Sequence, residues 1–376
     1  MKLTVLQENL AKAVTQASRF ASTRSQLPIL GNVLLKTNKT KLNVSSTNLE
    51  ISVLIQLGAK IEEEGEISIP SKIISEIVNN LPKEVLTLES EKEQLKITSS
   101  GFSSKVLGMN ASDFPKIPSR LEKSFILPKK ELLESLSQIT FATSTDETRP
   151  ILTGVYMILD NNELTLVATD GFRLSKKKIK FGTQKNDLTM QKIVIPKGIL
   201  GELSRSLEEE MEVQLEIQEK EKQVIFGFGE TILSSRLLEG DYPDFEKIIP
   251  KNSLITVRAD KEELLRAVKL ASIFAREAAN VVKIKLLKDE IKVLAESGTS
   301  GSQEMNVEAK IESEVPETSS GKFEISFNYR FLEEFLHSVS GEEVKMEFTT
   351  TDKAGVFTDS SDPDYLHLIM PVKVQV

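Results

Sequence analysis

Cysteine is absent from the 376-residue sequence, which excludes a disulfide framework, a thiolate nucleophile and a cysteine-bound metal. Histidine is scarce: His337 ends a helix-like run and His367 lies between two leucines in a strand-like run, contexts that favour a structural or surface role. The motifs of serine hydrolases, zinc proteases, phosphate-binding loops and dinucleotide-binding folds are missing as well. An enzymatic function is therefore unsupported, although these absences alone do not exclude it.

Long apolar segments are also missing. No apolar run approaches the roughly 18 residues that a membrane-spanning helix needs. The N-terminal stretch MKLTVLQENLAKAV has neither the apolar core nor the cleavage site of a signal peptide, and is typical of a strand followed by an amphipathic helix. A composition with 39% hydrophobic and 28% charged residues is that of a soluble globular protein. We therefore expect a cytoplasmic protein without a membrane partner.

The sequence does contain internal repeats. SRFASTRSQLPILGNVLL (18–35) resembles ITFATSTDETRPILTGVYMI (139–158), and a weaker copy, SIFAREAANVVKIKLL (272–287), lacks the Pro-Ile-Leu. A second marker, an aromatic residue with nearby prolines, occurs in ASDFPKIP, DYPDFEKIIP and SSDPDYLHLIMP. Both markers recur at a spacing of roughly 125 residues, which is within the usual size of one domain. We predict three homologous domains, at 1–120, 121–250 and 251–376.

Each predicted domain has the same order of elements. A strand leads into a helix, alternating strands follow, and a second helix precedes the last strands. In the first helix, Leu6, Leu10, Val14 and Ala17 share one face, and Pro70 suits the start of the second. The predicted fold class is α+β, with two helices in each domain and antiparallel sheets. The six helices are expected within 6–20, 67–81, 127–141, 195–207, 259–275 and 328–339.

Basic residues are fewer than acidic residues in the chain as a whole. The 48 basic and 56 acidic residues give a formal net charge of −8, which by itself argues against a large nucleic-acid footprint. Basic residues nevertheless gather on the expected helices, whereas acidic residues gather in segments such as 60–66 and 207–222. Ordinary solvated helix faces are one explanation; a phosphate-binding surface is the other, favoured by the hydroxyl-rich, arginine-containing loops 22–26 and 143–149. The basic residues on or beside the helices are Lys12, Arg19, Lys72, Lys129, Lys130, Lys197, Arg205, Lys261, Arg266, Lys269, Arg276 and Arg330.

The stretch VATDGFRLS (167–175) is the strongest local signal. An apolar strand ends in Asp170-Gly171, a turn-forming pair, and an exposed Arg173 is expected to follow. An acid with an arginine could form a catalytic site, an ordinary hairpin corner, or the rim of a binding pocket. Two acidic pairs, Asp241 with Asp244 and Asp362 with Asp364, are expected in turns, where aspartate forms local hydrogen bonds.

Five motifs in a fixed order carry a resemblance over the whole chain: MKLTVLQENL, LPILGNVLL, ATDGFRLS, DYPDF and LIMPVKV. Within three repeats, the sequence resembles the bacterial DNA polymerase III beta subunits, the replicative sliding clamps. The resemblance implies a non-catalytic processivity factor without cofactor or metal: a head-to-tail homodimer that encircles double-stranded DNA, with helices inside and sheets outside. It also implies ATP-dependent loading by a clamp loader and a nucleoid-associated location. Further implied partners are the polymerase alpha subunit, other DNA polymerases, ligase and mismatch-repair proteins, which dock through short linear motifs.

The resemblance also implies three sets of site residues. The pocket for partner peptides would comprise Leu152, Thr169, Gly171, Phe172, Arg173, Leu174, Pro243, Lys247, Ile248, Leu368, Ile369, Met370, Pro371 and Val372. DNA would contact Arg24 and Lys197, and the internal repeat extends this set to Lys72 and Arg149. The dimer interface would include Val106, Leu107, Ile273 and Phe274. The chain departs from the family at Phe172, where histidine or tyrosine is frequent, and at Lys247 and Lys373, where arginine is frequent. Because lysine is a point charge and not a planar fork, the preferred motif is expected to differ in detail.

Two alternatives remain at this point. One is an enzyme with an active site at Asp170 and Arg173 on a repeat scaffold, against which the lack of a neighbouring histidine, cysteine or metal motif counts. The other is a clamp paralogue with a role in repair or resistance. The first predicts turnover that is lost in Asp170→Asn. The second is hardly separable from a replicative clamp by sequence alone, whereas the position of its gene beside that of the replication initiator would separate them.

Overall fold

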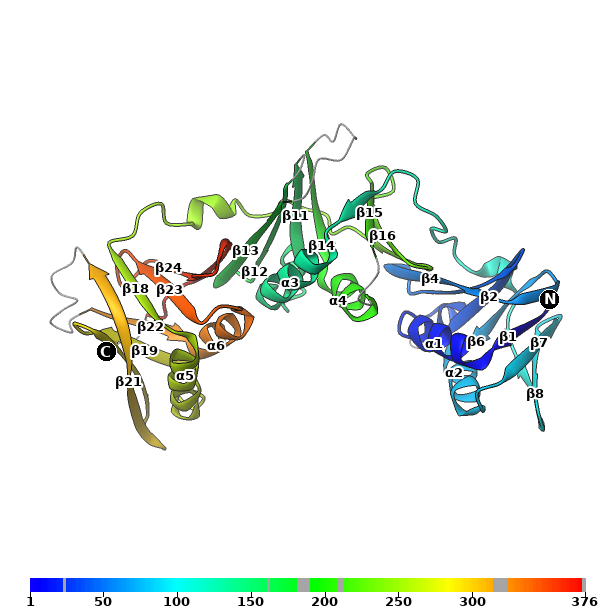
Figure 1. The fold of residues 1–376 in the computed structure, drawn as a ribbon, viewed down its shortest axis with the longest axis horizontal. Helices are drawn as coiled ribbons and strands as arrows, with labels where there is room; N and C mark the ends of the chain where they lie inside the picture. Colours follow the sequence, from blue (N-terminus) through cyan, green and yellow to red (C-terminus); the bar gives the residue numbers. More distant parts are fainter. Residues whose placement is uncertain (23–24, 161–162, 181–189, 208–211, 314–322, 374–376) are drawn as a thin grey trace. The chain divides into compact units, whose positions relative to one another are not determined.

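The computed structural model describes residues 1–22, 25–160, 163–180, 190–207, 212–313 and 323–373. They form two compact units, here called unit 1 (Met1–Lys129 and Gly198–Leu237) and unit 2 (Lys130–Lys197 and Leu238–Val376), each described by itself (Figure 1). The described residues contain six α-helices, each within a segment expected to be helical. They are α1 (Gln7–Ser18), α2 (Ser71–Asn80), α3 (Lys129–Ile139), α4 (Lys197–Ser206), α5 (Lys261–Ala275) and α6 (Tyr329–Ser338).

Unit 1 contains two antiparallel sheets. The smaller has the order β5-β1-β7-β8-β9, so that β9 lies at an edge, and the larger has the order β10-β15-β16-β17-β4-β3-β2-β6. The strands are β1 (Lys2–Leu6), β2 (Asn32–Asn38), β3 (Lys41–Thr47), β4 (Ile51–Gly58), β5 (Lys60–Glu63), β6 (Glu66–Pro70), β7 (Val85–Glu91), β8 (Gln94–Ser99), β9 (Phe102–Leu107), β10 (Phe125–Leu127), β15 (Val213–Gln218), β16 (Gln223–Phe228) and β17 (Thr231–Arg236).

Helices α1 and α2 pack side by side against the strands of unit 1 (Figure 1). Leu10, Val14 and Ala17 are buried on one face of α1, as their spacing predicts, because residues three and four apart lie on the same side of a helix. The Gln7 amide donates to the Val78 carbonyl of α2 at 2.7 Å and so joins the two helices. Pro70 immediately precedes α2, where its missing N–H costs no helical hydrogen bond.

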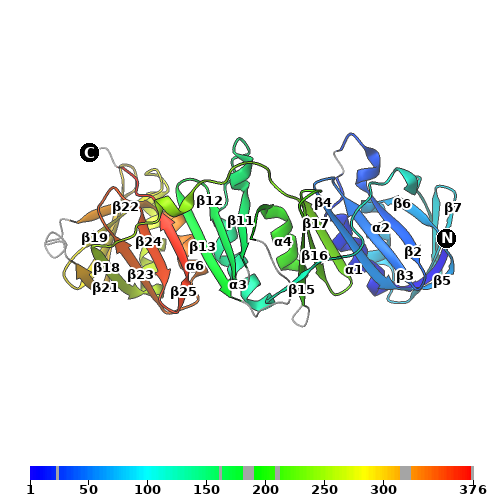
Figure 2. The ribbon, with the colours of Figure 1, turned by 90° about the horizontal axis from the view of Figure 1, so that it is seen from above.

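Unit 2 contains one continuous twelve-stranded sheet of order β14-β11-β12-β13-β25-β24-β23-β18-β21-β20-β19-β22 (Figure 2). Its strands are β11 (Gly154–Asp160), β12 (Glu163–Thr169), β13 (Arg173–Lys180), β14 (Gln191–Pro196), β18 (Ile255–Asp260), β19 (Val281–Leu286), β20 (Glu290–Ser297), β21 (Gly301–Ser313), β22 (Glu324–Asn328), β23 (Glu343–Phe348), β24 (Gly355–Asp359) and β25 (Asp362–Ile369). The sheet is continuous because β13 pairs antiparallel with β25, Arg173 opposite Ile369 and Leu174 opposite Leu368. This pairing brings segments nearly two hundred residues apart into one site.

An aromatic cluster forms part of the core of unit 2 under helices α5 and α6. The rings of Phe327, Phe335, Phe348 and Phe357 are all buried, with neighbouring centroids 5.5–6.2 Å apart. Tyr365 joins them, and its hydroxyl shares a 2.7 Å hydrogen bond with a serine of α6. Such packing fixes α6 against β25, and therefore against the neighbourhood of β13.

The repeated motif has the same local structure in its first two copies. Pro28–Gly31 and Pro150–Thr153 both form short 3₁₀ helices before a strand. Ser22 N–H donates to the Leu30 carbonyl at 2.7 Å, and Ser144 N–H donates to the Leu152 carbonyl at 2.8 Å. These matching hydrogen bonds support the sequence repeat as a structural one.

The predicted fold class is confirmed: the described residues form antiparallel sheets and six helices, an α+β arrangement. One local expectation was wrong, since Asp362 and Asp364 lie in strand β25 and not in a turn. Their carboxylates pair with lysines of β13. The sequence did not indicate these ion pairs, because the partners lie about 185 residues apart in the chain. None of the helices in the described ranges is both long and apolar enough to cross a membrane.

Candidate functional site

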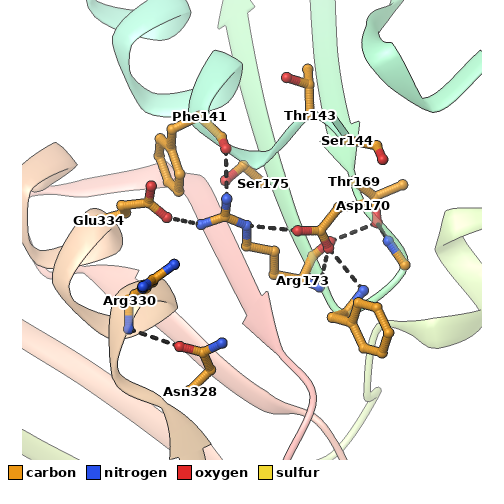
Figure 3. Close-up of polar contacts among 12 residues, drawn as sticks. Phe141, Thr143, Ser144, Thr169, Asp170, Arg173, Ser175, Asn328, Arg330 and Glu334 are labelled. Atoms are coloured by element: carbon orange, nitrogen blue, oxygen red, sulfur yellow. Dashed lines mark hydrogen bonds and ion pairs between the residues drawn. The ribbon is translucent and has the colours of Figure 1, made fainter. Parts of the chain in front are cut away.

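The turn between β12 and β13 is held by its own side chains (Figure 3). Oδ1 of Asp170 accepts hydrogen bonds from the backbone N–H groups of Phe172 (2.9 Å) and Arg173 (3.0 Å). Oγ1 of Thr169 donates to the Arg173 carbonyl at 2.6 Å and accepts from the Gly171 N–H at 3.0 Å. Gly171 has φ +95°, a conformation that side chains with a Cβ rarely adopt. Asp170 thus orders the corner, as expected of aspartate in a turn.

Arg173 is buried, which corrects the expectation of an exposed arginine. Only 8% of its surface is exposed, and its guanidinium points into the protein between three acceptors (Figure 3). Nε donates to Asp170 Oδ2 at 3.1 Å, Nη2 donates to the Phe141 carbonyl at 2.7 Å, and Nη1 pairs with Glu334 of α6. Its carbon Cζ also lies 4.5 Å from the ring centroid of Phe331. A planar group with five donors can be buried when its partners surround it, and two of these partners, Phe141 and Glu334, lie far away in sequence.

His367 lies beside this network and is completely buried. Its Nδ1 shares a 2.7 Å hydrogen bond with the Ser175 hydroxyl, and its ring lies 5.4 Å from those of Phe141 and Phe335. Burial, with the nearby charge of Arg173, lowers the pKa of His367 to about 3. The imidazole is therefore neutral and structural near neutral pH.

The buried His367 makes stability depend on pH. Its folded-state pKa lies below the ordinary 6.5, so below pH 6.5 the unfolded chain binds a proton that the native chain does not. This contribution destabilises the protein as the pH falls, by about 2 kcal/mol between pH 7.5 and pH 5. Urea unfolding at both pH values should show this loss in the wild type and a smaller loss in His367→Gln. His337→Gln, which changes the exposed histidine on α6, is the control; equal losses in all three proteins would contradict the prediction.

An exposed apolar surface surrounds the ordered turn. The Met370 N–H donates to the Phe172 carbonyl at 2.8 Å and so continues the β13–β25 pairing beyond the strand ends. Phe172, Ile248 and Met370 are 63%, 52% and 43% exposed. Leu174, Leu368 and Phe245 are buried together in one cluster, which anchors the 3₁₀ helix Phe245–Ile248 on the sheet. We call Phe172, Ile248 and Met370 the apolar rim.

The structure divides the fourteen expected pocket residues into groups. The buried ones, which support the surface from below, are Leu152, Thr169, Arg173, Leu174, Leu368 and Ile369. The exposed ones are Gly171, Phe172, Pro243, Lys247, Ile248 and Met370, and the half-buried ones are Pro371 and Val372. All fourteen belong to unit 2. The Lys247 ammonium pairs with Asp244 at 2.8 Å.

The other expected contact residues are distributed over both units. Lys72 and Lys197 are exposed at the starts of α2 and α4. Arg149 pairs with Asp146 at 3.2 Å and donates to the Asp170 carbonyl at 3.4 Å, which places it beside the 169–173 turn. Arg24 lies outside the described residues. Exposed basic side chains on or beside the helices are Lys12, Arg19, Lys72, Lys130, Lys197, Arg205, Arg266, Lys269, Arg276 and Arg330.

The four expected interface residues differ in exposure. Leu107, at the end of edge strand β9, is 72% exposed, whereas Val106 is buried in the core of its sheet. Ile273 is 58% exposed on α5, and Phe274 is partly buried against the core of unit 2. Within the described residues, the first half of β21 pairs only with β20, since β18 pairs with the second half.

No group of three or more metal-ligating side chains is present in the part of the chain that the structure describes. Asp170 and Arg173 are engaged by neighbouring groups. The nearby hydroxyl–imidazole pair, Ser175 with His367, is completely buried, so a substrate could not reach it as covalent catalysis requires.

Comparison with known proteins identifies the chain. Sequence models of the DNA polymerase III beta subunit match it three times in order: the N-terminal domain at residues 1–118, the central domain at 126–244 and the C-terminal domain at 246–373. The chain belongs to the DNA polymerase III beta subunit family. Its similarity to the Beta sliding clamp of Staphylococcus aureus is 29% identity over 385 residues, covering 99% of both chains. The alignment with the DNA polymerase sliding clamp of Bacillus subtilis covers both chains completely, at 28% identity and a TM-score of 0.93. The structure described as a DNA polymerase III beta subunit from Eubacterium rectale is also covered completely, at 25% identity and a TM-score of 0.91.

Family membership confirms the resemblance and the prediction of a non-catalytic sliding clamp subunit. The alternative of an enzyme at Asp170 and Arg173 is therefore wrong for this beta subunit. The pair instead stabilises the turn, because the carboxylate accepts two backbone N–H groups and the guanidinium at once.

The structure also adds residues of the third repeat that the sequence did not indicate. Val372 N–H donates to the Ser326 carbonyl of β22 at 2.8 Å. Beside it, Ala278, Ala279 and Val281 help to line a hollow of about 340 Å³ that Val372 borders. This beta subunit lacks the Pro-Ile-Leu marker in its third repeat, so no motif aligned these alanines with the first two copies.

Proposed function

We propose that this beta subunit closes head to tail with a second copy into a ring around duplex DNA and tethers the replicative polymerase through the apolar rim. The observation that carries the proposal is the rim itself: three exposed apolar side chains, one on a turn that the hydrogen bonds of Thr169 and Asp170 hold in place and two on neighbouring segments. Exposed apolar side chains that cluster, as Phe172 and Met370 do on hydrogen-bonded backbone, mark partner-binding surfaces, whereas single exposed ones do not. A pre-ordered turn also reduces the entropy lost on docking.

The rim suits a short linear peptide. Phe172, Met370 and Ile248 offer aromatic, thioether and aliphatic contacts, and Lys247 adds a charged group beside them. Peptides from the polymerase alpha subunit, the clamp loader, other polymerases, ligase and mismatch-repair proteins are the proposed occupants. All fourteen residues assigned to the pocket stay part of this proposal, the buried ones as its support.

Two strand edges support the proposed ring. Strand β9 of unit 1 ends its sheet, and the first half of β21 in unit 2 has one side without a partner strand in the described residues. Exposed apolar side chains accompany both, Leu107 at β9 and Ile273 on α5. Pairing β9 of one chain with β21 of the next would satisfy both edges and cover both side chains. Two such joints, head to tail, close a ring.

DNA contacts in this proposal are electrostatic and independent of sequence. The exposed basic residues named above, with Arg24, Lys72, Arg149 and Lys197, would face phosphates, while a dimer of net charge −16, twice −8, keeps its acidic groups elsewhere. A ring holds DNA topologically, so weak contacts suffice and sliding is possible. Loading by an ATP-dependent clamp loader, a nucleoid-associated location and domain boundaries near residues 120 and 250 belong to the same proposal.

The ring is tested by retention on DNA. Labelled protein is loaded onto a nicked circular plasmid with an active clamp loader and ATP, washed in high salt, and the plasmid is then linearised. Survival of the wash followed by release on cutting is expected of a topological link. Loss in the salt wash, with a control clamp retained by the same loader, would contradict the ring, because ordinary electrostatic binding is weakened by salt.

Leu107→Asp is expected to convert the dimer into a monomer. The substitution places a carboxylate at the proposed joint, where burial without a partner costs several kcal/mol. Analytical ultracentrifugation should show that the dimer dissociation constant rises by about a hundredfold or more, which is the change that a cost of several kcal/mol predicts. Val85→Asp is the control, since Val85 is an exposed apolar residue of the same five-stranded sheet outside the proposed joint. Equal weakening by both substitutions would contradict a joint at β9.

A further inference from the structure

Glu277, just after α5, gathers three hydroxyl groups from a hairpin. Its Oε2 accepts hydrogen bonds from Thr299 Oγ1 at 2.8 Å, from Ser297 Oγ at 3.2 Å, and from Ser300 Oγ. These hydrogen bonds hold the pKa of Glu277 below its ordinary value, those from Ser300 and Thr299 contributing most. The carboxylate is therefore charged at neutral pH, although no lysine or arginine pairs with it in the described ranges.

The three hydroxyls all belong to the connection between β20 and β21. Ser297 is the last residue of β20 and pairs with Gly301, the first residue of β21. Gly301 has φ +104°, and a Cβ built on it would lie 3.9 Å from the ring of Phe274. The hairpin tip therefore lies against the last turn of α5, next to the exposed Ile273.

The tip is already closed by its own hydrogen bonds. Ser297 Oγ accepts from the N–H groups of Thr299 (3.3 Å) and Ser300 (3.2 Å), and eight residue pairs join β20 to β21. The hairpin can therefore form without Glu277. What the carboxylate adds is a tie between the tip and α5, the two elements that would form one side of the ring joint.

We propose that Glu277 is a positioning residue for ring closure: it holds the start of β21 beside Ile273, so that both meet the second chain together. The inference rests on the proposed ring. Without the tie, the hairpin keeps its pairing but its tip moves independently of α5, and the joint must order it on closing. Each ring contains two joints, so the effect on dimer affinity is the square of the effect on one joint.

The test compares Glu277→Ala with Glu277→Gln and the wild type. Sedimentation should show a dimer dissociation constant about tenfold higher in Glu277→Ala than in the wild type, from about threefold at each of two joints. The constant of Glu277→Gln should lie between those of the wild type and Glu277→Ala, because glutamine keeps one acceptor oxygen. The opening rate on nicked circular DNA should rise in parallel. Hydrogen exchange should increase at residues 298–304, while the thermal midpoint and the affinity of the apolar rim for a polymerase peptide stay unchanged.

Glu290→Gln is the matched control. Glu290 is a carboxylate on the same hairpin that accepts from the Asn306 amide at 3.1 Å, at the end remote from the tip. Glu290→Gln also removes one negative charge, and it is expected to leave the dimer dissociation constant unchanged. If Glu277→Gln and Glu290→Gln weaken the dimer equally, the weakening is caused by the change in net charge. That result would overturn the positioning role of Glu277.

A double-mutant cycle tests the tie itself. Thr299→Val with Ser300→Ala removes two of the three donors, and should weaken the dimer as Glu277→Ala does, with no further loss when all three changes are combined. Additive losses would overturn the proposal. If the wild type is a dimer and Glu277→Ala dimerises equally well, the role of Glu277 is overturned and the ring is not. If the wild type is a monomer, the proposed ring is overturned as well.

Discussion

Replacing both Phe172 and Met370 with alanine is expected to abolish polymerase stimulation while leaving the dimer intact. Both side chains are exposed at the apolar rim, so their removal opens no cavity in the core. Alanine substitutions at the hot spots of an interface cost about 2 kcal/mol or more each, and Phe172 and Met370 are expected to be such residues, so the pair should weaken peptide binding by about a hundredfold or more. Fluorescence anisotropy with a labelled peptide from the polymerase alpha subunit measures the affinity, and primer extension on a long template measures stimulation.

Met190→Ala is the control for this experiment. Met190 is an exposed methionine of the same unit, with 53% of its surface accessible, and it lies outside the proposed pocket. Its replacement should change neither peptide affinity nor stimulation. Full stimulation by the Phe172 and Met370 double variant would contradict docking at the rim, and a loss of dimer would show that the residues act on folding or assembly.

Arg173→Ala is expected to destabilise unit 2 and, through it, the docking turn. The substitution removes a buried guanidinium from between Asp170, Glu334 and the Phe141 carbonyl, and it leaves the last of these without this donor. Asp170 and the Phe141 carbonyl lose a buried donor, whereas Glu334 is about half exposed, so the loss is about 2 kcal/mol. The free energy of unfolding, measured in urea, should fall by that amount, and peptide affinity should fall at temperatures where the protein is still folded.

A comparison with Arg149→Ala separates the two arginines. Arg149 also contacts this turn, but its side chain is about half exposed and its ion pair with Asp146 lies in solvent, so its removal should cost less than about 1 kcal/mol. In the proposed ring, Arg149→Ala should instead reduce the salt dependence of DNA binding. Similar unfolding free energies for both variants would contradict the structural role assigned to Arg173.

The sequence determined the fold class, the repeats and the family. Helix positions followed from residues such as Leu10, Val14 and Ala17, because the spacing of buried positions along a helix is a local property. The turn at Asp170 and Gly171 was equally local, since its hydrogen bonds join residues at most four apart. Five motifs in a fixed order then identified the family, because their order and spacing are retained at low overall identity.

Only the tertiary structure decided which site residues are exposed. Arg173 is buried because Glu334 and Phe141 surround it, and Val106 is buried because its side chain faces the core of its sheet. The tertiary structure likewise revealed the hydroxyl groups that hydrogen-bond to Glu277, which lie twenty or more residues away in the chain. Burial and electrostatic partners depend on pairings between distant segments, such as β13 with β25, and no local pattern encodes them. The sequence thus placed the site on the chain, and the folded chain separated its supporting residues from those that a partner can reach.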